Sequence, residues 1–96
     1  MPAPKPPSTR LVLSFGIGVR QLRESRGWSQ EKLAEHSTLN RSYIGEIERG
    51  DVIASLATVA KLAAALGVAP SALVNCGESI SDSHSARARQ LMAIDG

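Results

Sequence analysis

Two short helical segments joined by about four residues constrain the fold of this chain more than any other feature. Ser29 is placed to cap the first segment by accepting a hydrogen bond from a free backbone N–H group, and Asn40 is placed to cap the second. The second segment is predicted to run from Arg41 to Glu48. Because the connection, around Ser37 to Asn40, is so short, the two helices must cross at a sharp angle.

Three further segments with helical spacing surround this pair, and no segment alternates convincingly as a β-strand would. The segment before the pair spans about residues 13–26, and its apolar residues share one face: Phe15, Val19 and Leu22. Ser55 is placed to cap a segment over residues 56–66. The inward-facing residues of that segment are predicted to be Leu56, Val59, Leu62, Ala63 and Leu66. Pro70 suits the first turn of a last helix that ends near residue 74.

The predicted fold class is therefore all-α, with five helices in one compact domain between two tails. Residues 1–12 are assigned to a flexible, proline-rich arm, because four of the first nine residues are prolines and proline disfavours regular helix. Residues 13–76 form the domain. Residues 77–96 are read as a polar, serine-rich linker followed by a short C-terminal helix over residues 86–94.

Charge is distributed unevenly along the chain, although the net charge is only +2. Residues 1–50 carry eight Lys and Arg against five Glu, a balance of +3, whereas residues 51–96 carry three against four, a balance of −1. The basic excess therefore lies in the half that holds the helical pair, as expected of a nucleic-acid contact.

Several classes of function find no support in the sequence. No glycine-rich phosphate loop, nucleophile elbow or carboxylate pair indicates an enzyme, and no cofactor is predicted. Cys76 can form no disulfide within the chain, and neither His36 nor His84 has further ligands at a metal-binding spacing. No stretch approaches the roughly 20 apolar residues that cross a membrane, and no secretory signal is present. We expect a cytoplasmic protein without a metal or a membrane partner.

Two helices that cross after so short a connection form the helix-turn-helix arrangement, in which the second helix can enter the major groove of DNA. Ile44 and Ile47 are expected to anchor that helix to the rest of the domain. Its leading outer face would then meet DNA through Asn40, Arg41, Ser42, Gly45 and Glu46.

The run RQLRESRGWSQEKLAEHSTLNRSYIGEIERG, followed by SLATVAKLAAALGVAPSALV, resembles the Cro/phage-repressor type of helix-turn-helix regulator, often called the XRE family. The resemblance covers about residues 15–74 and rests on the pattern LR…RG.SQ…LA…R.YI..IERG with a second block ending in ALGV. It implies a compact five-helix, lambda-repressor-like fold. It also implies a homodimer that binds a palindromic operator in double-stranded DNA and regulates transcription, with repression the first expectation.

The resemblance implies roles for individual residues. The base-reading positions correspond to Arg41, Ser42 and Glu46. The positions that contact the phosphate backbone correspond to Gln30, Asn40, Tyr43 and Arg49. Gln30 would also brace the start of the recognition helix, whereas the ring of Tyr43 could instead pack against the fourth helix. Arg23 and Glu48 match a partly buried ion pair.

The chemistry of the base-reading side chains agrees with these roles. An arginine fork can bond O6 and N7 of guanine together, serine can bond several base edges, and glutamate can accept from N4 of cytosine. A good bidentate pair contributes about 1–3 kcal/mol of discrimination against the wrong base. Arg41 is therefore the strongest base-reading candidate.

Two residues depart from the family pattern, because Thr38 stands where the turn usually has glycine and Ser37 where an apolar residue is more common. A β-branched residue is poorly suited to positive φ, so the turn should either differ locally or be strained at Thr38. The dimer contact is expected around Val68 to Val74, because Leu73 and Val74 lack an obvious partner in so small a core.

Three alternative functions stay open. The same module could serve as a restriction-modification controller or as an antitoxin, which would also have a protein partner. A protein-interaction module that has lost DNA binding would associate with DNA weakly and with little dependence on salt. An enzyme is the least supported of the three.

Overall fold

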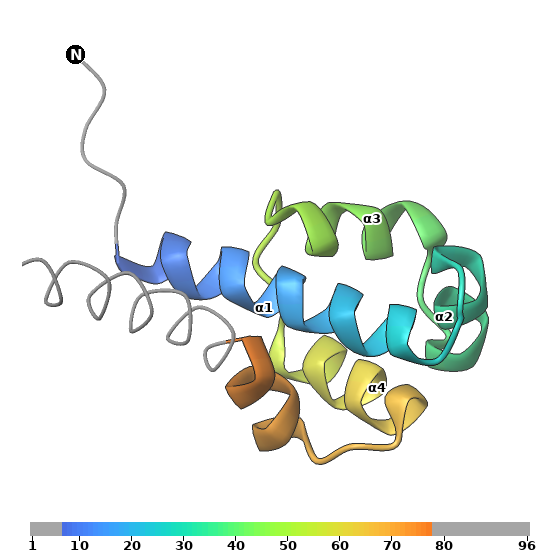
Figure 1. Ribbon diagram of the computed structural model, residues 1–96. Helices are drawn as coiled ribbons and strands as arrows, with labels where there is room; N and C mark the ends of the chain where they lie inside the picture. Colours follow the sequence, from blue (N-terminus) through green and yellow to red (C-terminus); the bar gives the residue numbers. More distant parts are fainter. Residues whose placement is uncertain (1–6, 78–96) are drawn as a thin grey trace, which may run out of the picture.

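The computed structural model describes residues 7–77, and within this range it contains five helices and no strand. The helices are α1 (Pro7–Ser25), α2 (Gln30–Ser37), α3 (Arg41–Arg49), α4 (Leu56–Leu66) and a last helix over Pro70–Gly77 (Figure 1). The predicted all-α class with five helices is confirmed. Residues 1–6 and 78–96 lie outside the described range, and with them part of the predicted arm, nearly all of the predicted linker, the predicted C-terminal helix and His84.

α1 begins at Pro7 rather than at Leu13, so residues 7–12 belong to a helix and not to an extended arm. The prediction was wrong because it treated the four N-terminal prolines alike and did not consider Pro7 as the first residue of a helix, the position that it gave to Pro70. At the first helical residue the missing N–H would have no partner within the helix, and the fixed φ of proline already suits helical geometry. The predicted inner face of α1 is confirmed, with Phe15 and Val19 buried and Leu22 packed partly against the core.

α1 lies between α3 on one side and α4 on the other (Figure 1). The core fills the space between the helices, and its fully buried side chains are Val19, Leu33, Ile44, Ile47, Leu62, Leu66 and Leu73. Two expectations are wrong. Leu56 is 88% exposed rather than inward-facing, because the first turn of α4 extends beyond the edge of the core. Leu73 has no exposed surface, so it completes the core of its own chain and is not available for a dimer contact.

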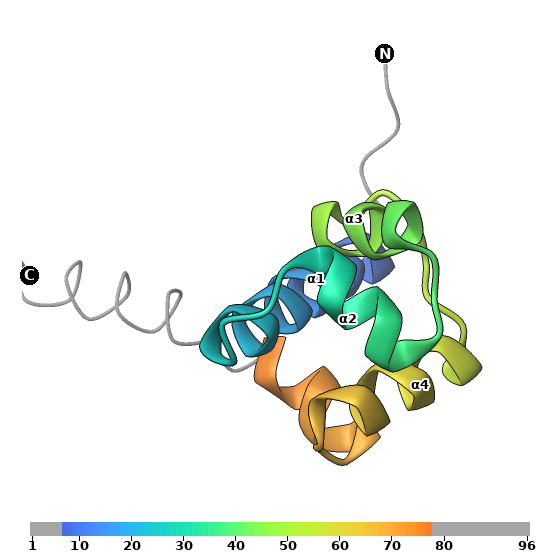
Figure 2. The same cartoon turned by 90° about the vertical axis from the view of Figure 1, so that its right-hand side faces the viewer.

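The three predicted N-caps set the starts of α2, α3 and α4. Each side chain accepts a hydrogen bond from a backbone N–H of the first helical turn, at 3.0 Å for Ser29, 2.7 Å for Asn40 and 3.1 Å for Ser55. These bonds satisfy N–H groups that have no acceptor inside a helix. As a result α2 and α3 begin where predicted, and α2 lies between α3 and α4 (Figure 2).

The turn between α2 and α3 keeps a backbone conformation that favours glycine. Thr38 has φ 59°, the only positive φ of a non-glycine residue within residues 7–77, so the strain expected there is present. Its N–H donates to the carbonyl of Ala34. Ser37 is buried, and its hydroxyl donates to the carbonyl of Leu33 at 2.7 Å. The polar residue that replaces an apolar one therefore has its hydrogen bond satisfied.

The last helix reaches Gly77, where it lies against α1, and thus continues beyond the predicted end near residue 74. A Cβ on Gly18 would lie 2.9 Å from the backbone nitrogen of Gly77, closer than real Cβ contacts allow. The two backbones touch at a point where only glycine fits. The folded unit therefore includes residues 7–12 and Gly77, which the sequence analysis had assigned to the tails.

Within residues 7–77 no single helix is long and apolar enough to cross a bilayer. α4 and the last helix reach the required length and composition only when taken together, and they are bent by 94° relative to each other. The apolar residues Leu62 and Leu66 of α4 are instead buried inside the domain.

Candidate nucleic-acid interface

α3 has two faces of different chemistry. Its inner face carries Ile44 and Ile47, which are buried in the core as predicted. A side chain on Gly16 of α1 would collide with the carbonyl oxygen of Ile47, so α1 and the end of α3 touch backbone to backbone. The outer face carries Arg41 and Ser42, and both are exposed. α3 is therefore fixed along one side and open along the other.

The expected ion pair between Arg23 of α1 and Glu48 of α3 is present and bidentate. Nε of Arg23 donates to Oε2 of Glu48 at 2.7 Å, and Nη2 donates to Oε1 at 3.0 Å. The two side chains are only 12% and 3% exposed, respectively. Nη1 of Arg23 also donates to the carbonyl of Trp28 at 2.7 Å, so the guanidinium joins α1, the connection before α2 and the end of α3.

Hydrogen bonding to Glu48 raises the pKa of Arg23 above its usual value, although burial alone would lower it. The guanidinium therefore stays charged at any physiological pH, and the pair fixes the direction in which α3 leaves the body. Breaking such a pair by removing one partner costs more than the pair contributes net, because the other charge would be left buried.

Gln30 braces α3 near its end rather than at its start. Its Nε2 donates to Oε1 of Glu48 at 3.1 Å, which ties the first residue of α2 to the ion pair. A Cβ on Gly45 would lie 3.6 Å from Oε1 of Gln30, so the amide also lies beside the middle of α3. The sequence correctly paired Gln30 with the recognition helix but placed the brace at the wrong end, because the angle between α2 and α3 cannot be read from their spacing.

A shallow, polar hollow of about 220 Å³ lies along the outer face of α3, and we call it the α3 hollow. Its lining residues are Gln30, Arg41, Ser42, Gly45, Glu46 and Arg49. The structure thus brings together all three predicted base-reading residues and two of the four predicted phosphate-contacting residues. Two arginines and one glutamate give the lining a net positive charge, which suits an anionic ligand.

Arg49 has a partner that sequence reasoning missed. Its Nε donates to Oδ2 of Asp51 at 2.9 Å, just beyond the end of α3, and the two side chains are 62% and 56% exposed. Nη1 of Arg49 lies 3.1 Å from the position that a Cβ on Gly45 would occupy. The guanidinium therefore lies over the middle of α3. The opposite charges two residues apart were the one signal for this contact in the sequence.

Asn40 and Tyr43 lie outside the α3 hollow. Oδ1 of Asn40 accepts from the N–H of Ser42 as the N-cap of α3, and the residue is exposed. Tyr43 is half-buried against the core, and its hydroxyl lies 3.2 Å from Oγ1 of Thr58 on α4. The ring of Tyr43 therefore packs toward α4, which the sequence analysis had left open, and Thr58 is a partner that it missed.

Residues 19–73 match the model of a helix-turn-helix family, HTH_3, and this is more than half of the chain. The chain belongs to this family. The match includes all of α2, α3 and α4 and thus every helix that lines the α3 hollow. The helix-turn-helix protein is a DNA-binding regulator of transcription.

Similar proteins include regulators of two kinds. The chain is 48% identical over 69 residues to control protein C.BamHI of Bacillus amyloliquefaciens, and this match covers 71% of this chain and 85% of that protein. It is 39% identical over 62 residues to the immunity repressor protein of Bacillus phage phi105, and this match covers 65% of this chain and 43% of the repressor. The restriction-modification controller protein C.AhdI of Aeromonas hydrophila has a similar structure, with a TM-score of 0.63 and 47% identity over 65% of this chain and 94% of the controller.

Proposed function

We propose that this helix-turn-helix protein is a cytoplasmic, sequence-specific repressor that binds a palindromic operator as a homodimer. In this proposal the outer face of α3 enters the major groove of double-stranded DNA. The α3 hollow is the observation that carries the proposal. Its two arginines and its smaller polar side chains surround a helix whose opposite face is fixed by the core and by the pair of Arg23 with Glu48.

Sequence is read in this proposal by Arg41, Ser42 and Glu46. The side chains of Arg41 and Glu46 have no hydrogen-bond or ion-pair partner among residues 7–77, so they are available to base edges without breaking an internal bond. The planar fork of Arg41 suits guanine O6 and N7, and the carboxylate of Glu46 suits the amine of cytosine. Phosphates repel the carboxylate of Glu46 unless it accepts such a bond. Glu46 therefore favours sequences with a cytosine at this position in addition to binding them.

Phosphate contacts are assigned to Gln30, Asn40, Tyr43 and Arg49. Each keeps a donor in addition to the bond that positions it: Asn40, for example, uses Oδ1 as a cap and retains the N–H groups of its Nδ2 amide for DNA. Tyr43 can accept from Thr58 and donate its own proton to a phosphate. Contacts of this kind set the register of α3 on the duplex without carrying sequence information.

A second copy of the chain is proposed to cover an exposed apolar surface. Ile53 is 78% exposed and Leu56 is 88% exposed, and Leu11 of α1 is 44% exposed. These three residues, together with Val74 of the last helix, line one apolar groove of about 300 Å³ and are called the apolar patch. Large exposed apolar side chains gathered around a groove mark an interaction site.

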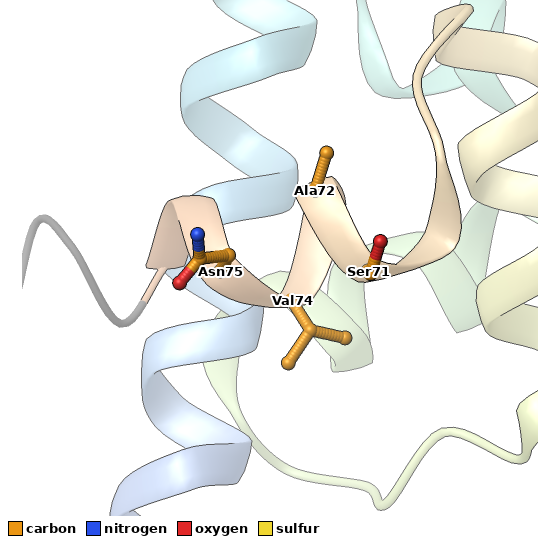
Figure 3. A pocket seen from close by; sticks show the side chains of 4 residues that line it. All are labelled: Ser71, Ala72, Val74 and Asn75. Atoms are coloured by element: carbon orange, nitrogen blue, oxygen red, sulfur yellow. The ribbon is translucent and has the colours of Figure 1, made fainter.

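The apolar patch has the two parts that an isologous contact needs. Ile53 and Leu56 protrude, whereas Phe15 and Val59 lie deeper in the groove, so the protrusion of one copy can enter the groove of the other. Val74 points from the last helix toward the connection between α3 and α4, and it also borders a more open hollow with Ser71, Ala72 and Asn75 (Figure 3). The proposed dimer contact is therefore at the surface around Leu56 and not at Leu73, which is buried.

Within this function we propose the role of a restriction-modification controller. The support is that the restriction-modification controller protein C.AhdI and control protein C.BamHI are 47% and 48% identical to the chain and are covered over 94% and 85% of their own lengths. The phage immunity repressor is less similar and is covered over only 43% of its length. In this role the protein would control the transcription of restriction-modification genes.

Selection of bound duplexes from a random pool tests the function as a whole. We expect a site with two inverted half-sites whose centres lie about one helical turn, roughly 34 Å, apart. Affinity for the selected duplex should fall steeply as salt rises and should exceed that for random DNA by about 10³-fold or more. Weak binding without salt dependence, or enrichment of no sequence, would instead support the protein-interaction module.

A further inference from the structure

Two features around the side chain of Arg49 are not required by a plain phosphate contact. Its Nε donates to Asp51 at 2.9 Å, and its Nη1 lies 3.1 Å from the position of a Cβ on Gly45. We propose that Asp51 and Gly45 are positioning residues that aim the guanidinium of Arg49 at a DNA phosphate. The inference rests on the proposed function, because it assigns the way in which one contact of that interface is made.

The bond to Asp51 leaves the useful part of the guanidinium free. Asp51 accepts only from Nε, so both terminal nitrogens of Arg49 keep their N–H groups for another anion. Two parallel N–H donors match two oxygens of one phosphate group. Asp51 therefore fixes the plane of the fork without occupying it.

The ion pair between Arg49 and Asp51 is not explained by the stability of the fold. The side chains of Arg49 and Asp51 are 62% and 56% exposed, and pairs between exposed side chains contribute little to folding. By contrast, an arginine that is already oriented loses less conformational freedom when it binds DNA. The pair is therefore better explained by binding than by folding.

Gly45 supplies the space in which the fork lies. Glycine inside a helix costs stability relative to alanine, yet it stands in the middle of α3. A Cβ at this position would come within 3.1 Å of Nη1 of Arg49, which is tighter than an ordinary contact, so the guanidinium would have to shift by a few tenths of an ångström. The missing side chain is what lets Arg49 lie over α3 beside Gln30.

Whether Asp51→Ala raises or lowers the affinity for DNA separates a positioning role of Asp51 from a simple electrostatic one. Asp51 brings a negative charge next to the phosphates, so electrostatics alone predicts that Asp51→Ala binds DNA more tightly. If Asp51 aims Arg49, the same substitution should weaken binding, although it removes a repulsive charge. Asp51→Asn keeps an oxygen that can accept from Nε and should recover part of the lost affinity.

The experiment is a double-mutant cycle on the duplex that the wild-type protein selects from a random pool. We expect Asp51→Ala to weaken binding about tenfold, since a charge-assisted bond holds the fork. In the Arg49→Ala background the same change should have no weakening effect. Arg49→Ala should weaken all sequences alike and reduce the slope of log affinity against log salt by about 0.9. Gly45→Ala should weaken binding severalfold while the thermal unfolding midpoint stays equal or rises.

Each contrary result has a distinct meaning. Unchanged or tighter binding by Asp51→Ala, or an equal loss with and without Arg49, overturns the positioning role. If Gly45→Ala fails to fold, as judged by circular dichroism, the cycle between Asp51 and Arg49 decides alone. If the wild-type protein selects no duplex, the proposed function itself is rejected, and the inference with it. This outcome is known before any variant is made.

Discussion

The α3 hollow and the apolar patch are built in opposite ways. The side chains of the hollow come almost entirely from one nine-residue helix, with Gln30 the single contribution from elsewhere. The apolar patch is assembled from three separate stretches: α1, the segment from residue 52 to the start of α4, and the last helix. The first surface is polar and must hold a fixed geometry to match a rigid duplex. The second gains its free energy from the removal of water, which depends on area more than on direction.

This difference suggests a division of labour. A single α3 makes few contacts, so its affinity for one half-site is expected to be weak. A dimer joined through the apolar patch presents two such helices at once, and the second half-site is then bound as an intramolecular event. The polar surface would therefore determine which sequence is bound, and the apolar surface how tightly.

The largest effect should come from separating the two copies. We expect Leu56→Asp to make the protein monomeric and to weaken operator binding about 10²–10⁴-fold, because the linked half-site contacts become independent. Leu56 is 88% exposed, so the fold should be unaffected. The control is Lys61→Gln at an exposed position of α4, which changes the net charge by the same amount and should have little effect on oligomeric state or operator binding. Sedimentation equilibrium gives the oligomeric state, and a dimeric Leu56→Asp protein would disprove the assigned interface.

The next largest effect should come from the bond that fixes α3 to the body. Glu48→Ala leaves Arg23 charged, partly buried and without its carboxylate, so we expect a loss of about 3 kcal/mol in the free energy of unfolding. Urea denaturation measures it. Glu24→Ala is the matched control, because its pair with Arg20 is exposed, with side chains 56% and 64% exposed, respectively, and should cost less than about 0.5 kcal/mol. Equal losses in both variants would show that the buried pair does not fix α3.

A smaller effect, on specificity rather than stability, is expected at the leading end of α3. Arg41→Ala should lower discrimination at one operator position by about 1–3 kcal/mol and leave preference at the other positions intact. Arg49→Ala should instead weaken binding to every sequence. Affinities for a panel of single-base operator variants separate the two patterns. If Arg41→Ala weakened all probes uniformly, Arg41 would be a phosphate contact and not a base reader.

The smallest effect concerns the turn that joins the two helices. Thr38→Gly should stabilise the protein by about 0.5–1 kcal/mol, because it relieves a left-handed conformation at a β-branched residue. Operator affinity should not change. Glu35→Gly, an exposed position inside α2, should destabilise by about 1 kcal/mol and serves as the control of opposite sign. Thermal unfolding followed by circular dichroism distinguishes these outcomes, and a destabilised Thr38→Gly protein would mean that the threonine is not strained.

The features that could be predicted from the sequence are those encoded within a few residues of each other. N-cap side chains locate the starts of α2, α3 and α4, because the bond from Asn40 or Ser55 closes within one helical turn. The spacing of Ile44 and Ile47, three residues apart among polar neighbours, identifies the inner face of α3. The pair of Arg23 with Glu48 was expected only from the family pattern, since residues 25 positions apart give no local signal.

The features that could not be predicted depend on where helices end in space. Leu56 and Leu73 both have the helical spacing of core residues, and only the packing of α4 and the last helix on α1 decides that one is exposed and the other buried. The helical state of residues 7–12 depends on Pro7 being the first residue of a helix and not an interior one. The contact of Arg49 with Asp51 and Gly45 depends on a rotamer that the sequence does not specify.

The most direct test of the central claim, that the outer face of α3 reads the major groove, is methylation interference on the selected duplex. Methylation of guanine N7 probes the major groove, and methylation of adenine N3 probes the minor groove. We predict that N7 methylation at guanines in two symmetric positions about one helical turn apart blocks binding, and that Arg41→Ala abolishes this interference at both. Interference confined to adenine N3, or guanine interference that persists in Arg41→Ala, would contradict the account.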